Sequence, residues 1–110
     1  MEQAKNALSN EDWIQADGYQ KGTYAKILRD ENGGKTMLLQ LPKGFYMPPH
    51  SHITTEQHFV LDGEYISNDV TYTVGTYQRF APGDEHGPFS SETGALILVC
   101  WDPLEIKKAE

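Results

Sequence analysis

One stretch of twenty residues, Gly44 to Gly63, restricts the fold of this chain more than any other. It reads GFYMPPHSHITTEQHFVLDG and holds three of the four histidines. Two consecutive prolines remove backbone donors and keep the chain that enters His50 out of a helix. On an extended strand, residues two apart point to the same face, so His50 and His52 are expected to lie side by side. The stretch therefore predicts an extended segment that presents paired imidazoles.

Paired imidazoles beside a carboxylate predict a site for a divalent metal ion. Glu56 follows His52 closely, and the fourth histidine, His86, lies in a second turn-rich run, GTYQRFAPGDEHGP. Imidazole suits zinc, iron, nickel and copper, while a carboxylate extends the choice toward harder ions. A closed structural zinc site would more often use cysteines, and the chain has only Cys100. Cys100 falls in the apolar run ALILVCW, where a buried strand thiol is the expected role.

Length, charge and cysteine content limit the remaining possibilities. A chain of 110 residues is expected to form one domain, here residues 11–103, with a flexible tail at 1–10 and another at 104–110. The net charge of −7 disfavours nucleic acid and anionic membrane surfaces as partners. No apolar run approaches the roughly 20 residues of a membrane span. The absence of a signal-peptide core and of a disulfide framework leads us to expect a cytoplasmic protein.

The chain as a whole has the pattern of an all-β protein. Many short β-prone runs separated by Gly, Pro and Asn turns predict a sandwich or barrel. Strands are expected to open at Trp13-Ile14 and to recur at 23–28, 36–41, 58–61, within 64–80 and at 95–101. The sequence Asn32-Gly33-Gly34 supplies the positive φ angles that a tight hairpin needs. Further turns are expected at 17–18, 62–63, 67–69 and 82–84.

The histidine-rich stretch resembles the first motif of the cupin superfamily, G-x5-H-x-H-x3,4-E-x6-G. The matching positions are Gly44, His50, His52, Glu56 and Gly63. The second motif, G-x5-P-x-G-x2-H-x3-N, is matched only in part. Six residues separate Gly75 from Pro82, Gly83 follows the proline directly, and Ser90 replaces the final asparagine.

With these departures, the second motif resembles that of the ChrR-type cupins. This branch of the superfamily includes the C-terminal domain of a zinc-dependent anti-sigma factor. The likeness rests on the run Gly75, Tyr77, Arg79, Pro82, Gly83, His86 and Pro88. It extends upstream to Trp13 and so covers roughly 90 residues. No anti-sigma domain with its own zinc ligands precedes it, so a regulatory role by that route is not expected.

The resemblance implies a small double-stranded β-helix, a jelly-roll barrel, with one divalent metal ion near its mouth. It implies Fe(II) or Zn(II), with Mn(II) or Ni(II) as further options, bound by His50, His52, Glu56 and His86. One or two coordination positions would stay open. His58 lies two residues beyond Glu56 and is expected on the same face. It could replace Glu56 as a ligand, since some dioxygenases of the superfamily use only histidines. Alternatively, it could orient a ligand residue, act as a catalytic base or be a core histidine.

Function is less constrained than fold, because one barrel hosts many chemistries. Arg79 is a candidate for holding an anionic substrate, with a surface salt bridge as the alternative. Tyr77 and Tyr46 are further candidates for the substrate pocket. We consider a metal-dependent enzyme, with dioxygenase-type cleavage of a small oxygenated substrate or Lewis-acid chemistry, and a non-catalytic metal or ligand sensor. Small cupins commonly pair their sheets, so a homodimer is expected.

Overall fold

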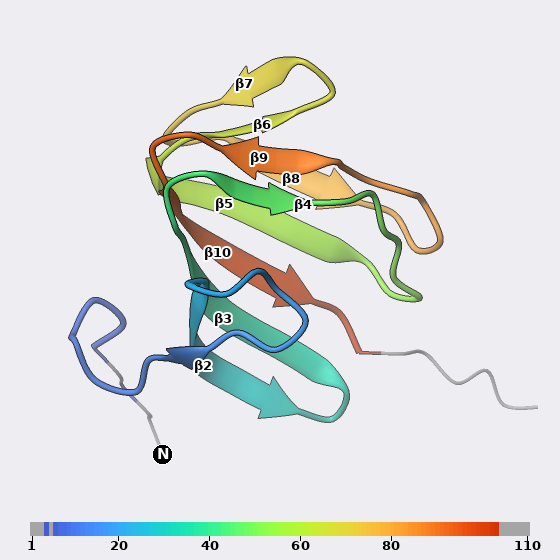
Figure 1. Ribbon diagram of the computed structural model, residues 1–110. Coiled ribbons are helices and arrows are strands. Elements are labelled where there is room, and N and C mark those ends of the chain that lie inside the picture. The colour runs from blue at the N-terminus through green and yellow to red at the C-terminus, as the bar shows by residue number, and fades with distance from the viewer. Residues whose placement is uncertain (1–3, 5, 104–110) are drawn as a thin grey trace, which may run out of the picture.

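The computed structural model describes residue 4 and residues 6–103, which fold into two antiparallel sheets (Figure 1). The larger sheet has the strand order β1-β2-β3-β10-β5-β8, and the smaller has the order β4-β9-β6-β7. The strands are β1 (Ile14–Gln15), β2 (Tyr24–Glu31), β3 (Gly34–Leu41), β4 (Phe45–Met47), β5 (Glu56–Gly63), β6 (Tyr65–Ser67), β7 (Val70–Tyr72), β8 (Tyr77–Phe80), β9 (Phe89–Ser91) and β10 (Ala95–Trp101). The expected all-β architecture is confirmed.

Turn chemistry accounts for the local connections. Asn32 and Gly33 adopt φ angles of 53° and 82° in the hairpin between β2 and β3, as predicted. Asn68 and Asp69 likewise adopt positive φ angles, and they join β6 to β7. These turns set the register of neighbouring strands without help from distant parts of the chain.

The last strand, β10, connects the two parts of the larger sheet. It lies between β3 and β5, with Val99 opposite Met37 on one side and His58 on the other. Its buried residues alternate, so Ala95, Ile97 and Val99 face the space between the sheets. There they join a core that also contains Leu39, Leu41, Phe45, Val60, Tyr65 and Phe89. Burial of this apolar surface is the main source of stability.

Two short strands were not among those that we expected. We expected the chain before Pro48 only to be extended, and no strand was expected at 89–91. The structure pairs β4 with β9, Phe45 opposite Ser91. A strand of three residues is too short to show alternation, so its pairing depends on the tertiary fold.

The flexible tail that we expected at 1–10 stays a prediction, but the described part of this segment has contacts with the sheet. From Asn6 onward it lies against β2, where the buried ammonium group of Lys26 donates to the Ser9 carbonyl at 2.6 Å. The Lys26 side chain is 1% exposed and also lies over the Trp13 ring, 5.1 Å from its centroid. The expected tail at 104–110 lies outside the described residues. Within the described part of the chain, no helix is long and apolar enough to cross a membrane.

Candidate metal centre

Backbone pairing brings together the two histidine-bearing segments, which lie far apart in the sequence. The amide of His50 donates to the carbonyl of His86 at 2.9 Å, and the amide of His86 donates back at 2.8 Å. The amide of Gly83 donates to the carbonyl of His52 at 2.8 Å. The turn at 82–84 therefore returns the chain so that His86 lies beside His50 and His52.

The strand β5 supplies the carboxylate. Glu56 is its first residue and lies opposite Trp101 of β10 and Phe80 of β8. Glu56 and His58 are both buried, as expected for residues two apart on the inner face of a strand. Phe80 packs against the rings of His58 and His86, with centroid separations of 4.8 and 4.3 Å. These contacts restrict the rotation of both imidazoles.

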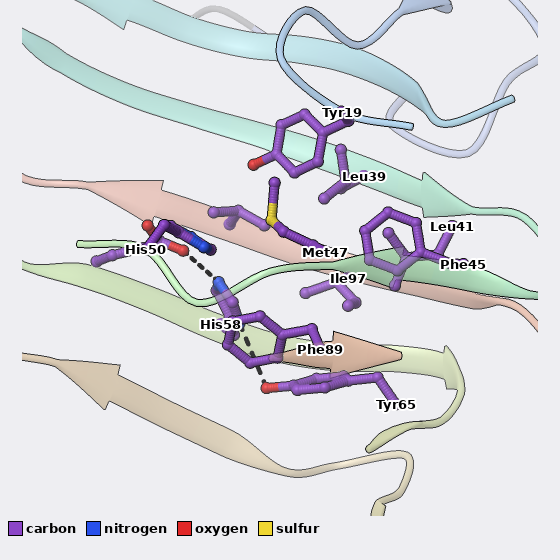
Figure 2. Close-up of a pocket in the computed structure, with 12 residues that line it drawn as sticks. Tyr19, Leu39, Leu41, Phe45, Met47, His50, His58, Tyr65, Phe89 and Ile97 are labelled. Atoms are coloured by element: carbon purple, nitrogen blue, oxygen red, sulfur yellow. Dashed lines mark hydrogen bonds and ion pairs between the residues drawn. The ribbon is translucent and has the colours of Figure 1, made fainter. Parts of the chain in front are cut away.

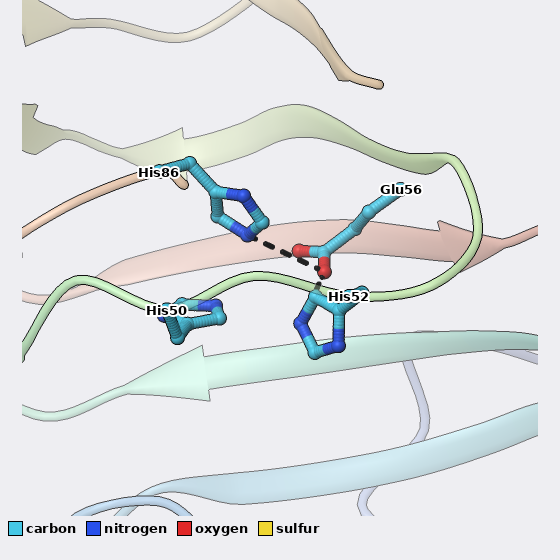
Figure 3. A group of neighbouring side chains, drawn as sticks. All are labelled: His50, His52, Glu56 and His86. Atoms are coloured by element: carbon cyan, nitrogen blue, oxygen red, sulfur yellow. Dashed lines mark ion pairs between the residues drawn. The ribbon is translucent and has the colours of Figure 1, made fainter. Parts of the chain in front are cut away.

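The four side chains of the cupin motifs converge on one point (Figure 3). His50, His52, Glu56 and His86 each offer one ligand atom, and these atoms all lie within 4.8 Å of one another. Glu56 Oε1 lies 2.8 Å from His52 Nε2 and 3.7 Å from His86 Nε2. Glu56 is 2% exposed, whereas the side chain of His52 is 35% exposed. The group is thus buried at Glu56 and His86 and partly exposed at His50 and His52.

The hydrogen bonds of the histidines leave ring nitrogens free to bind a cation. Nδ1 of His50 lies 3.2 Å from the Pro48 carbonyl, and Nδ1 of His86 lies 3.2 Å from the Asp84 carbonyl. A carbonyl only accepts, so each Nδ1 carries the proton, and Nε2 of the neutral ring keeps a free lone pair. The buried Nε2 atoms of His52 and His86 lie 2.8 and 3.7 Å from Glu56 Oε1, but neither makes a hydrogen bond to the described residues. Buried imidazole nitrogens that make no hydrogen bond and lie next to a carboxylate oxygen are a suitable donor set for a divalent metal.

Glu56 is ionised in this environment. Burial alone would raise the pKa of Glu56, but the hydrogen bond from His58, the charges of His58 and His52, and the hydrogen bond from Trp101 together lower it. Trp101 Nε1 donates to Oε1 at 2.7 Å, and His58 Nε2 donates to Oε2. Each oxygen keeps a second lone pair, so Glu56 can bind a metal while it is held in place.

Burial also keeps His86 in the neutral form that binds metals. Burial lowers the pKa of His86, and the neighbouring His50 and His52 lower it further, against the opposing charge of Glu56. An imidazole must be deprotonated at one nitrogen to bind a metal ion. The metal-free site is therefore already close to its binding state at neutral pH.

His58 lies behind Glu56 and outside the four-residue group. Nδ1 of His58 is 3.3 Å from the Tyr65 hydroxyl, and that hydroxyl is hydrogen-bonded to Gln78. A chain of polar contacts thus runs inward from Glu56 through His58 and Tyr65 to Gln78. Of the roles that we considered for His58, this position favours a partner of the carboxylate over a direct ligand.

Two hollows adjoin the group. An interior cavity of about 20 Å³ has room for about one water (Figure 2). It is lined by His50, Glu56 and His58, by the tyrosines Tyr19 and Tyr65, and by apolar side chains. A wider groove of about 530 Å³ is lined by His52, Trp101 and residues of β1 to β3. The groove falls within the range of about 300–1,000 Å³ that is typical of small-molecule sites. An organic molecule therefore fits the groove and not the interior cavity.

The three residues that we expected to bind substrate do not lie at the group. Tyr46 and Tyr77 are each 53% exposed, and Arg79 is exposed as well. In β8 the neighbouring residues Gln78 and Phe80 face the interior instead. Alternation along a strand places residues two apart on one face, and here Tyr77 and Arg79 occupy the outer one. On this geometry they contact neither the cavity nor the groove.

Two residues that line the site were not recognised from the sequence as part of it. The indole of Trp101 donates to Glu56 across 45 residues of sequence. Tyr19 lies in the turn segment after β1 and lines both the cavity and the groove. No local pattern could have found either one, because both reach the site through tertiary contacts.

Fold and motif placement define this protein as a cupin. The family model described as the ChrR Cupin-like domain matches residues 2–105, so the chain belongs to that family. The resemblance noted in the sequence is thereby confirmed. No curated protein matches the chain in sequence.

Several solved structures share the fold. A chain of the complex of Rhodobacter sphaeroides SigE with the anti-sigma ChrR is 24% identical, with a TM-score of 0.72; the match covers 86% of this chain and 51% of that one. This chain therefore spans about half the length of that relative. An acetylacetone dioxygenase from Acinetobacter johnsonii is 14% identical, with a TM-score of 0.76 and coverages of 92% and 74%. An RmlC-like cupin from Shewanella frigidimarina is 20% identical, with a TM-score of 0.72 and coverages of 94% and 96%. At these identities the likeness shows the fold alone.

Proposed function

We propose that this cupin is a small enzyme that depends on one metal ion held by His50, His52, Glu56 and His86. The observation that carries the proposal is the convergence of four ligand atoms within 4.8 Å, two of them buried nitrogens without a hydrogen-bond partner. Three nitrogens and one carboxylate oxygen suit Fe(II) and Zn(II), and also accept Mn(II) or Ni(II). Four protein ligands leave room for one or two further ligands on such an ion.

The reaction that we propose is dioxygenase-type cleavage of a small oxygenated substrate, with Lewis-acid chemistry as the neighbouring possibility. A bound Fe(II) would supply redox chemistry with dioxygen and polarise substrate oxygens. The fold similarity to an acetylacetone dioxygenase supports this choice of reaction class. The groove beside His52 has the volume for a small organic molecule.

The chain's own residues would order this site before substrate arrives. Trp101 and His58 hold the two oxygens of Glu56, and backbone carbonyls orient the rings of His50 and His86. Preorganisation of this kind reduces the reorganisation that the reaction would otherwise require. His58 Nε2 is the group that we propose to hold a proton next to Glu56.

A second candidate function is a non-catalytic domain that senses a metal or a ligand and reports to a partner protein. Membership of the ChrR Cupin-like family supports it, since the ChrR of the solved complex is an anti-sigma bound to SigE. In this reading the same four residues would hold zinc. A metal-dependent partner in a pull-down, together with absence of turnover, would favour this candidate.

Elemental analysis of the purified protein tests the metal site. We expect stoichiometric metal in the wild type and in Ser51→Ala, an exposed neighbour, and its loss in His50→Ala. If Glu56→Ala keeps full metal content, Glu56 is not a ligand. A wild type that takes up no metal, even after reconstitution with Fe(II) or Zn(II), would refute the proposal.

Oxygen consumption then separates the two functions. The iron-loaded protein should consume dioxygen when mixed with members of a panel of diketones, phenolic ketones and carboxylates, and the metal-free protein should not. An iron-loaded protein that consumes no dioxygen with any of them would exclude the dioxygenase within that panel and favour the sensor.

A further inference from the structure

Tyr19 occupies the boundary between the interior cavity and the outer groove. It belongs to the turn segment that joins β1 to β2, and its ring packs against the core. Its side chain lines the cavity that Glu56 and His50 also line, and it lines the groove that His52 borders. Figure 2 shows the ring across the pocket from His58, with its hydroxyl end toward His50.

The segment that carries Tyr19 is anchored to both sheets. The side chain of Gln15, in the larger sheet, accepts from the Gly22 amide at 3.1 Å and donates to the carbonyls of Ala16 and Gln20 at 3.4 Å. The Gln20 side chain accepts from the Tyr46 amide, in the smaller sheet, at 2.9 Å. Tyr19 is therefore held in a defined place by hydrogen bonds at both ends of its turn.

The hydroxyl of Tyr19 has no hydrogen-bond partner among the described residues. The other polar side chains that line the cavity each have one, namely His50, Glu56, His58 and Tyr65. Burial raises the pKa of the Tyr19 phenol, and the charge of Glu56 raises it further. The group therefore stays protonated and is available as a hydrogen-bond donor.

We propose that the Tyr19 hydroxyl donates a hydrogen bond to an oxygen atom of the molecule that binds at the metal centre. The inference rests on the proposed metal site and adds a residue for substrate recognition to it. It also specifies the ligand class: a small oxygen chelator with a carbonyl, enolate or hydroxamate oxygen that can accept from a phenol. A ligand of that kind, entering by the groove, would give the unpaired hydroxyl the partner that the protein does not supply.

The test uses Tyr19→Phe, which keeps the ring and removes only the hydroxyl. The protein is loaded with Co(II), whose visible absorption reports on its ligands, and is titrated with acetohydroxamate. We expect Tyr19→Phe to bind Co(II) and to melt as the wild type does, but to bind acetohydroxamate about five- to tenfold more weakly, the effect of one lost hydrogen bond. Tyr24→Phe, which removes a half-exposed hydroxyl of β2, should change none of these quantities.

The possible failures are distinct. Equal acetohydroxamate affinity in the wild type and Tyr19→Phe would overturn the inference and leave the metal site intact. A cobalt-loaded wild type whose spectrum does not respond to acetohydroxamate would also overturn it, because a small oxygen chelator of the proposed class would then fail to reach the metal. A wild type that fails to bind Co(II) would instead refute the proposed metal function on which the inference rests.

Discussion

At the scale of residues, the buried carboxylate of Glu56 depends on its neighbours for its geometry. Trp101 and His58 each donate to one of its oxygens, so the side chain cannot turn freely. A buried acceptor that loses its partner costs about 1–3 kcal/mol, and more when it is charged. The residues around Glu56 should therefore influence the proposed metal site as strongly as some of the candidate ligands do.

Trp101→Phe tests this dependence. The substitution preserves an aromatic ring and removes the Nε1 donor to Glu56, so we expect metal affinity to fall about 10- to 100-fold. A competition titration with a chromophoric chelator measures it. Trp13→Phe is the matched control, because Trp13 Nε1 donates to the Ser9 carbonyl away from the site. Equal loss in both variants would contradict a specific role for Trp101.

The stability of the metal-free protein should decline in acid. The pKa of Glu56 lies below its unfolded value of 4.5, so its ionised form stabilises the fold above that pH, and this contribution is lost as the pH falls through the lowered pKa. The pKa of His86 also lies below its unfolded value of 6.5, so the unfolded chain binds that proton first, and stability begins to fall below pH 6.5.

Thermal melts of the metal-free protein between pH 7.5 and pH 4 check this dependence. We expect a progressive fall in melting temperature, and the part that begins near pH 6.5 should be smaller in His86→Gln. A melting temperature that does not change over this range would contradict the environment assigned to His86, since the contribution of Glu56 is lost only below its unfolded pKa of 4.5.

At the scale of elements, the end of β5 shows why a motif glycine is required. Gly63 adopts a φ of +69°, and a Cβ built there would lie 2.2 Å from the Gly94 carbonyl oxygen. Gly44, at the other end of the same motif, adopts a φ of +76° but has no atom within 4 Å of that position. The two glycines share a backbone conformation and differ in the space around them.

Gly63→Ala and Gly44→Ala separate the two effects. An L-residue at positive φ costs about 1–2 kcal/mol, which applies to both. Overpacking against backbone adds about 1–3 kcal/mol at Gly63 alone. We therefore expect Gly63→Ala to lower the free energy of unfolding by about 2–5 kcal/mol in urea titrations, and Gly44→Ala by only about 1–2 kcal/mol. Equal losses would contradict the close approach of β5 to the turn at Gly94.

At the scale of the whole molecule, the outer face of the larger sheet carries exposed apolar side chains. Phe59 and Tyr77 are cross-strand neighbours on β5 and β8, and they are 41% and 53% exposed. Leu61 of β5 is also exposed. Adjacent exposed apolar groups on an edge of a sheet are typical of a surface that associates. A second copy of the chain is the occupant that we expect.

Sedimentation velocity tests the expected homodimer. The wild type should sediment as a dimer, and Phe59→Asp should shift it toward the monomer, because a charge would then be buried at the interface. Ile53→Asp, at an exposed loop position, should have no effect. A wild type that stays monomeric as its concentration rises would contradict the expectation.

Much of this protein follows from local sequence. Turn residues with positive φ, strands with a period of two and the spacing of His50, His52 and Glu56 are all short-range features, so they predicted the all-β class and the group of candidate ligands. The short strands β4 and β9 were not predicted, because three residues carry no period.

Only the tertiary structure decided what surrounds the candidate ligands. Alternation shows that a strand has two faces but not which one is buried, so the outward direction of Tyr77 and Arg79 depends on how β8 pairs with β5. Trp101 lies beside Glu56 because β10 pairs with β5 in one register. Tyr19 reaches the cavity because its turn is bound to both sheets. Contacts between residues so far apart are fixed by the packing of the whole core, which no local pattern encodes.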